Sequence, residues 1–263
     1  MGAQTRQSLD QARTLLAGRS ALGLSLAENL FAAALGLSGS PALRNALSDS
    51  ASEALARKQL AAQAFASLST DAKKIVDELV SMRWSSAEDL QEALEDLGIR
   101  VCAGSVDAKT DLVGELLAIS TLVHSNAELE LGLGSKRARP SDRANLMGSL
   151  LGKKVSGEAL AIARHLVADP RGRRIGAMLQ SAAVTVADHH GKGLAVVSVA
   201  KSLKEAQRVS VEKLLRKNYG RDHYVAEVMT PDVVGGMKIR VGDDVIDGSI
   251  QARLADLRTQ LAG

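Results

Sequence analysis

Residues 5 to about 190 follow a helical pattern of apolar and polar positions. One apolar stripe at helical spacing consists of Leu112, Leu116, Ile119 and Val123. The chain contains four prolines, which leaves room for long unbroken helices. Ser85, followed three residues later by Glu88, predicts a helix that begins after Trp84, because such a pair can cap the free amide groups of a first turn.

The helical part contains an internal repeat. The segment at 40–49 resembles the segment at 126–135, and Leu60 falls on Leu146, 86 residues later in both cases. Four apolar residues within 75–80 fall on residues 87 positions later. Several matches in order with one small gap favour a duplication over chance. We therefore expect two related helical modules, at 1–104 and 105–190.

The two modules differ in charge. Residues 70–96 carry eight acids and three bases, whereas residues 136–174 carry ten bases and three acids. Charge runs of this kind are usually solvated helix faces. The alternative is that the two copies face different partners.

From about residue 191 the pattern changes to strands alternating with one helix. The apolar, β-branched run at 194–199 predicts a buried strand. Ser202 and Glu205 predict the start of a helix that ends at 218–220, and residues 223–229 predict a second strand. We expect a third domain at 191–263, so the fold class is α+β: a mostly helical bundle followed by a small α/β domain.

The last predicted elements are a β-hairpin and a terminal helix. Residues 237–241 alternate between apolar and basic side chains, as in a strand with one buried face. Gly242-Asp243-Asp244 predicts a tight turn into a return strand at 245–246. Asp247-Gly248-Ser249 then precedes a helix. Its predicted apolar stripe is Ile250, Leu254, Leu257 and Leu261.

No residue pattern indicates catalysis, a cofactor or a metal. The nearest match to a phosphate-binding loop, at 148–154, is one residue short and has no Ser or Thr after its lysine. His189 and His190 are adjacent, so on a helix they point about 100° apart. Cys102 lies among apolar residues and is expected to be a buried thiol, and Trp84 is expected in the core or at an interface.

Composition narrows the class of protein further. The net charge is +3 and aromatic residues are 2% of the chain, which leaves little basis for nucleic-acid binding. The single cysteine excludes an internal disulfide. No apolar run approaches the roughly 18 residues of a spanning helix, and the N-terminus lacks a signal peptide's apolar core. We expect a soluble, cytoplasmic chain that meets a membrane only through a partner.

These features together resemble a known family. PDVVGGMKIRVGDDVIDGSIQARL, at 231–254, resembles the C-terminal signature of the delta subunit of the F-type ATP synthase. The segments at 194–221, 146–167 and 76–98 are similar to the parts that precede this signature in long actinobacterial delta subunits. Thr230 and Ser202 stand where family members often have aspartate and proline. The structural signature residues are Pro231, Gly235, Gly236, Gly242, Asp243, Asp247, Gly248 and Ser249.

The resemblance implies a non-catalytic stator subunit. In the family, delta joins the catalytic head to the b subunit of the peripheral stalk, one copy per complex, at the cytoplasmic face of the cell membrane. The helical domain docks on N-terminal helices of the alpha subunits, with the beta subunits as a further candidate contact. The C-terminal domain, here 194–261, meets the b subunit. We expect the alpha helices on an apolar face near Leu26–Leu35 or Leu112–Val123.

Two other classes remain open. A helical adaptor could bind nucleic acid through residues 136–174, and such binding would depend strongly on salt. An enzyme with a site assembled from distant residues would show a deep pocket with strongly shifted pKa values.

Overall fold

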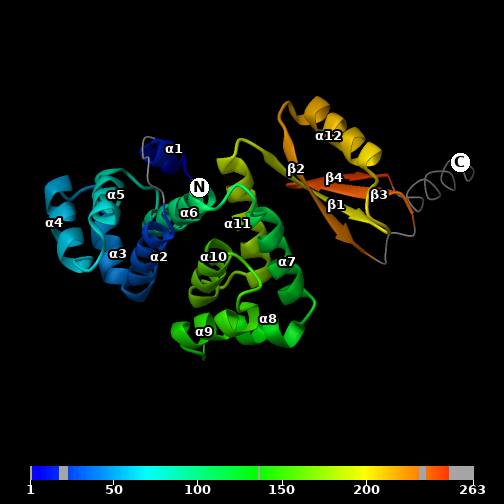
Figure 1. Cartoon of the computed structure of the whole chain (residues 1–263). Coiled ribbons are helices and arrows are strands. Elements are labelled where there is room, and N and C mark those ends of the chain that lie inside the picture. The colour runs from blue at the N-terminus through cyan, green and yellow to red at the C-terminus, as the bar shows by residue number, and fades with distance from the viewer. Residues whose placement is uncertain (1, 18–22, 136, 231–234, 249–263) are drawn as a thin grey trace, which may run out of the picture. The chain divides into compact units, whose positions relative to one another are not determined.

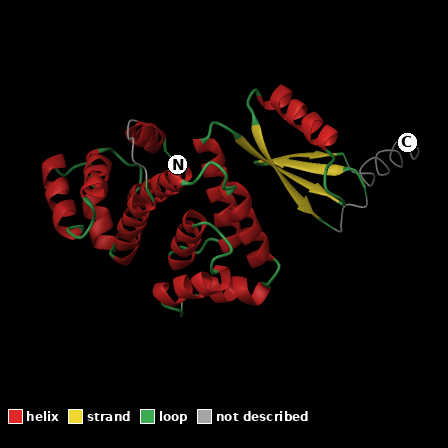
Figure 2. Ribbon diagram, in the orientation of Figure 1, coloured by secondary structure: helices red, strands yellow, loops and turns green. Residues whose placement is uncertain are grey.

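The computed structural model describes residues 2–17, 23–135, 137–230 and 235–248. The chain divides into two compact units, residues 1–186 and residues 187–263. The first is helical, and the second holds a four-stranded sheet (Figures 1 and 2). The predicted α+β class, mostly helical with a small sheet toward the C-terminus, is confirmed. No helix in the described part of the chain is long and apolar enough to cross a membrane.

Eleven helices precede the first strand in the described chain. They are α1 (Ala3–Ala17), α2 (Leu24–Gly39), α3 (Pro41–Ser48), α4 (Ala54–Ala64), α5 (Thr70–Ser81), α6 (Ala87–Ser105), α7 (Leu112–His124), α8 (Ala127–Gly134), α9 (Pro140–Leu151), α10 (Gly157–Ala168) and α11 (Ile175–His189).

The helix bounds repeat along the chain. Helix α3 begins at Pro41 and α8 at Ala127, 86 residues later; α5 begins at Thr70 and α10 at Gly157, 87 residues later. The pairs α2 and α7, α4 and α9, and α6 and α11 show offsets of 88, 86 and 88 residues. Five consecutive helices are therefore followed by five more of matching order and spacing. We call α1–α6 the first module and α7–α11 the second.

Hydrogen bonds repeat with the helices. In the first module the amide of Ser69 donates to Asn29 Oδ1 at 2.8 Å, and in the second the amide of Ser156 donates to Glu115 Oε1 at 3.1 Å. Both serines are N-caps, of α5 and α10. The same tertiary contact thus fixes the start of the same helix in each copy.

A buried arginine repeats in the same way. Arg57 on α4 donates to the carbonyl of Met82 at 3.2 Å, and Arg143 on α9 donates to the carbonyl of Ala168 at 2.7 Å. Each carbonyl lies where α5 or α10 ends, so the arginine satisfies a helix C-terminus that the helix itself cannot. Repeated contacts of this kind support a duplication beyond the sequence match.

Helix α6 occupies the centre of the helical unit. Thirteen of its 19 residues are buried, and it packs against α1, α2, α3, α5 and α10. The α5–α6 loop lies on α1, where Ser8 donates to the carbonyl of Arg83, while the α10–α11 loop lies on α6 through Glu95. Helix α6 therefore contacts the α10–α11 loop of the second module in the way that α1 contacts the α5–α6 loop of the first. Separate domains at 1–104 and 105–190 stay a prediction, since α6 contacts helices of both modules.

Two predicted helix caps are wrong by one or more residues. Helix α6 is capped at Ser86, whose amide donates to Asp89, because Ser85 instead bonds to Thr5 of α1. Helix α12 (Glu205–Tyr219) is capped at Lys204, because the Ser202 hydroxyl donates to Glu227 on a neighbouring strand. In both places a tertiary hydrogen bond occupies the serine that the local motif would use.

The second unit is a mixed sheet covered on one face by α12. Its strands are β1 (Gly193–Val199), β2 (His223–Met229), β3 (Met237–Val241) and β4 (Asp244–Asp247), in the order β2-β1-β3-β4. Strand β1 is parallel to β2 and antiparallel to β3, and β3 and β4 form a hairpin. The strands predicted at 194–199, 223–229 and 237–241 are confirmed. The predicted helix with the Ile250–Leu261 stripe lies outside the described residues.

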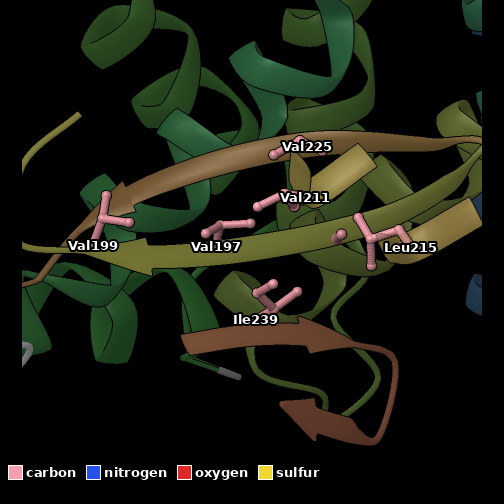
Figure 3. Packing of buried hydrophobic residues seen from close by; sticks show 7 residues of the cluster. Val197, Val199, Val211, Leu215, Val225 and Ile239 are labelled. Atoms are coloured by element: carbon pink, nitrogen blue, oxygen red, sulfur yellow. The ribbon is translucent and has the colours of Figure 1, made fainter. Parts of the chain in front are cut away.

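Aliphatic side chains join this sheet to α12. Figure 3 shows Val197 and Val199 of β1 beside Val225 of β2 and Ile239 of β3, with Val211 of α12 facing them. Alternation along β3 places Ile239 inside, at 2% exposure, while its neighbours Lys238 and Arg240 are exposed. The small core is built from β-branched residues, as expected for a half-buried sheet.

The close packing of α6 gives a first prediction. A Cβ added at Gly98 would overlap Phe31 Cε1, so Gly98→Ala should destabilise the helical unit by about 1–3 kcal/mol through overpacking. A Cβ added at Gly132 on α8 would meet no atom within 4 Å, so Gly132→Ala should stabilise by about 0.5–1 kcal/mol. Denaturant unfolding followed by circular dichroism measures both. Equal effects of the two substitutions would contradict the packing.

Candidate functional site

The signature residues of the second unit build the β3–β4 hairpin. Gly242 and Asp243 form the two-residue turn between the paired Val241 and Asp244, and Gly242 has a φ of 58° that suits glycine. Gly236, just before β3, has a φ of 84°. Gly235 precedes it at the same bend. These positions serve the turn chemistry that the sequence predicted for them.

The remaining signature residues follow the hairpin or fall outside the described chain. Asp247 ends β4 opposite Lys238, and the amide of Gly248 donates to the carbonyl of Met237 at 2.9 Å. Pro231 and Ser249 lie outside the described residues. A role of the signature in binding a partner is not tested by these contacts and stays a prediction.

The apolar stripes expected to receive the alpha helices are core, which corrects that expectation. The buried residues of the two segments are Leu26, Ala27, Leu30, Phe31, Ala33 and Ala34 on α2, and Leu112, Val113, Leu116, Ile119 and Val123 on α7. Helical periodicity identifies an apolar face but cannot say whether that face meets the same chain or another. Here both faces pack inside the helical unit.

Among the described residues of the helical unit, four exposed leucines lie on the second module and one, Leu55, lies on the first. Leu122, Leu131, Leu146 and Leu150 are 46%, 75%, 43% and 38% exposed. At the position 86 residues before each, the first module has Gly36, Asn45, Leu60 and Ala64. The second copy therefore offers apolar side chains where the first has small, polar or less exposed residues.

The basic character of the second module is partly structural. Arg143 is buried at 7% exposure and Arg171 and Arg173 pair with Glu95, so these bases hold the fold together. Within the part of this segment that the structure describes, the exposed bases are Arg137, Arg139, Lys153, Lys154, Arg164 and Arg174. The net charge of a segment thus overstates what it presents to a partner.

The most connected polar group is Glu95 on α6. It accepts hydrogen bonds from Arg173 Nη1 at 2.8 Å, from Arg171 Nη2 at 2.5 Å and from His165 at 3.2 Å. Burial by itself would raise the pKa of Glu95, but the hydrogen bonds from His165 and Arg173 and the charges of both arginines hold this pKa well below its usual range. Glu95 is therefore an ionised, fully paired carboxylate.

A second carboxylate, Asp169, extends this network. It accepts from Ser38 on α2 at 2.7 Å and from Gln91 on α6 at 2.6 Å, and it lies 3.4 Å from Arg171. The contacts with Ser38 and Gln91 join the α10–α11 loop of the second module to helices of the first.

A cavity of about 410 Å³ borders the network. Its apolar floor includes Leu9, Ile99, Leu166 and Met178, and its charged lining includes Arg13, Glu92, Glu95, Asp96 and Arg173. Arg13 pairs with Asp96 at 3.3 Å, and Arg173 with Glu95. Charges that neutralise one another in this way suit a structural joint better than acid–base chemistry.

The other singled-out residues have ordinary structural settings. Trp84 is buried and donates to the carbonyl of Leu79 at 2.9 Å. Cys102 is buried, which raises the pKa of its thiol. His189 and His190, at the end of α11, contact each other edge to face. No group of three or more potential metal-binding side chains occurs within the described ranges.

The fold and the surface define the class of protein. It is a helical protein with a small α/β unit, and one helical module carries exposed apolar and basic side chains. Residues 102–261 match the family model "ATP synthase delta (OSCP) subunit". The chain belongs to the ATP synthase delta (OSCP) subunit family.

Full-length relatives support this membership. The chain is 41% identical to the ATP synthase subunit delta of Leifsonia xyli over 100% of both chains. It is 33% identical to that of Cutibacterium acnes over 97% of both. Identity to the Nocardioides sp. protein is 33% over 91% of this chain and 88% of that one. All three are actinobacterial, as the resemblance to long delta subunits implied.

The ionised state of Glu95 predicts an acid-sensitive helical unit. A lowered pKa contributes stability above the unfolded value of 4.5 and loses it as pH falls below that value. Glu95→Gln should cost about 1–3 kcal/mol at neutral pH, because it removes the charge with which the half-buried Arg171 and Arg173 pair. It should also flatten the loss of stability below pH 4.5. Denaturant unfolding at several pH values measures both effects.

Glu92→Gln is the matched control. Glu92 is on the same helix but 46% exposed, and its contact with Arg171 is 4.0 Å long. It should change the unfolding free energy by no more than about 1 kcal/mol. A pH profile of Glu95→Gln that parallels the unmodified protein would contradict the assignment.

Proposed function

We propose that this protein is a non-catalytic peripheral-stalk subunit of a proton-translocating F-type ATP synthase. It links the catalytic alpha/beta head to the b subunit, one copy per complex, so that rotor torque drives ATP synthesis instead of turning the head. Membership of the delta family over the full chain carries this proposal. As part of this membrane-bound complex, the protein lies at the cytoplasmic face of the cell membrane.

The architecture is suited to carrying force. The helical unit is a close-packed assembly of leucine and alanine side chains, and such interiors deform little. Two units allow two attachments, one for each partner. We assign the head to the helical unit and the b subunit to residues 194–261.

We place the alpha contact on the second module. The family model begins at Cys102, near the end of α6, so it covers α7–α11 and the second unit but little of the first module. The exposed leucines of α9 together with the nearby Lys153 and Lys154 fit an amphipathic helix with an apolar stripe and acidic flank. The first module then adds length and stiffness.

The assignment of one partner to each unit predicts how a truncated chain behaves. Ending the protein after His190 keeps α11 whole and removes the sheet unit. This truncated chain should still capture alpha and beta subunits but lose the b subunit in an affinity pull-down from native membranes, read by mass spectrometry. The full-length chain should recover all three.

Each alternative has its own result in that experiment. Normal recovery of the b subunit by the truncated chain would overturn its assignment to residues 194–261. Recovery of nucleic acid or a regulator by the full chain, with no alpha, beta or b subunit, would replace the stator role with the adaptor class.

The second-module contact predicts an asymmetric mutational effect. Replacing both Leu146 and Leu150 on α9 with glutamate should weaken capture of alpha subunits roughly 30-fold or more, because apolar anchors dominate interface energies. Leu55 on α4, at 65% exposure, provides a control on the corresponding helix of the first module, where it is an exposed leucine. Leu55→Glu should leave capture unchanged, whereas a larger loss from Leu55→Glu would move the contact to the first module.

A further inference from the structure

The two helical modules contact each other through ion pairs. The matching contact within the first module, between the α5–α6 loop and α1, is made by hydroxyl and backbone groups. In the first module the α5–α6 loop contacts α1 through hydroxyl groups: Ser8 donates to the Arg83 carbonyl at 2.7 Å, and Thr5 accepts from the Ser85 amide at 3.0 Å. The matching α10–α11 loop contacts α6 through ion pairs instead. Arg171 and Arg173 occupy the positions 88 residues after Arg83 and Ser85.

We call this ionic contact the Glu95 joint. It comprises Ser38, Gln91 and Glu95 from the first module, and His165, Asp169, Arg171 and Arg173 from the second. The side chains of Glu95 and Asp169 are 11% and 9% exposed. Buried ions interact strongly only while their geometry is complete, so such a contact is either made or lost as a whole.

Backbone strain is concentrated in the same loop. Arg171 has a φ of 49°, in the left-handed region that non-glycine residues rarely adopt, and Gly172 follows with a φ of 76°. A strained residue persists only when its surroundings hold it. Here the contacts of the Arg171 guanidinium with Glu95 and Asp169 hold it, so opening the joint would release the strain.

The joint lies beside the packing of α10 on α2 and α6, and there is open space next to it. The His165 ring stacks on Phe31 with centroids 4.4 Å apart. The cavity of about 410 Å³ is lined by Glu95 and Arg173 of the joint itself. Ions that separate into such a space can be rehydrated, which lowers the barrier to opening compared with a sealed apolar contact.

We propose that the Glu95 joint is a latch: closed, it fixes the second module on the first, and open, it lets the two modules turn relative to each other. The residues of the joint are positioning residues that set an angle within the helical unit. This inference goes beyond the proposed function and does not depend on it.

Distance measurements between spin labels test the latch in the full chain. Labels at Gln63→Cys on α4 and Ser149→Cys on α9 report on the two modules, because both positions are exposed. The natural Cys102 can remain, since it is buried. With Glu95 intact we expect one narrow distribution of distances. With Glu95→Gln a second distance should emerge, a rise of roughly 100-fold in the population of the open state.

Two further variants make the result decisive. Glu92→Gln, on the same helix at the exposed edge of the joint, where Glu92 reaches Arg171 only at 4.0 Å, should keep the single narrow distribution. Arg173→Gln is a milder change at a side chain that is 37% exposed, and it should give an intermediate population if Glu95→Gln fails to fold. The latch is refuted if a folded Glu95→Gln or Arg173→Gln keeps the wild-type distribution. It is equally refuted if Glu92→Gln broadens the distribution as much as they do.

Discussion

Burial of α6 is the constraint on which the helical unit depends. This one helix is the last of the first module and stands in for the first helix of the second, so both modules share its surface. With aromatic residues at 2% of the chain, the surrounding core must be filled by leucine and alanine at short distances. The approach of Phe31 to Gly98 is one result. Sharing α6 ties the two modules together, and it limits how far the sequence of α6 can vary.

Local signals in the sequence predicted most elements of the fold, and failed where a tertiary contact competes. The alternation in β3 and the glycine–aspartate turn after it depend on neighbours in sequence, and both are confirmed. The caps near Ser85 and Ser202 were misplaced because those residues bond to distant ones. A capping motif describes what a serine can do alone. The motif carries no information about Thr5, which lies 80 residues from Ser85, or about Glu227, which lies 25 residues from Ser202.

The candidate surfaces were harder to predict, because they too depend on contacts between residues far apart in the sequence. An apolar stripe such as that of α7 has the same spacing whether it faces its own core or a partner, and here it faces the core. The useful signal was a difference between the copies: Leu131 stands where the first copy has Asn45. Glu95 gave no local signal at all, because its partners lie 70 to 78 residues further along the chain. Comparison of the repeats could have indicated it, since Arg173 appears where the first copy has Ser85.

A stalk subunit passes force through its contacts in series, so its weakest joint decides its stiffness. Apolar helix packing resists deformation gradually, because losing one contact leaves the others in place. The ionic contact at Glu95 differs, since losing its arginines would leave a buried carboxylate without a counter-charge. It therefore resists small displacements strongly and yields at a threshold. Placing such a contact between two copies of one module makes that boundary, within the helical unit, the point where stiffness is set by a few named side chains.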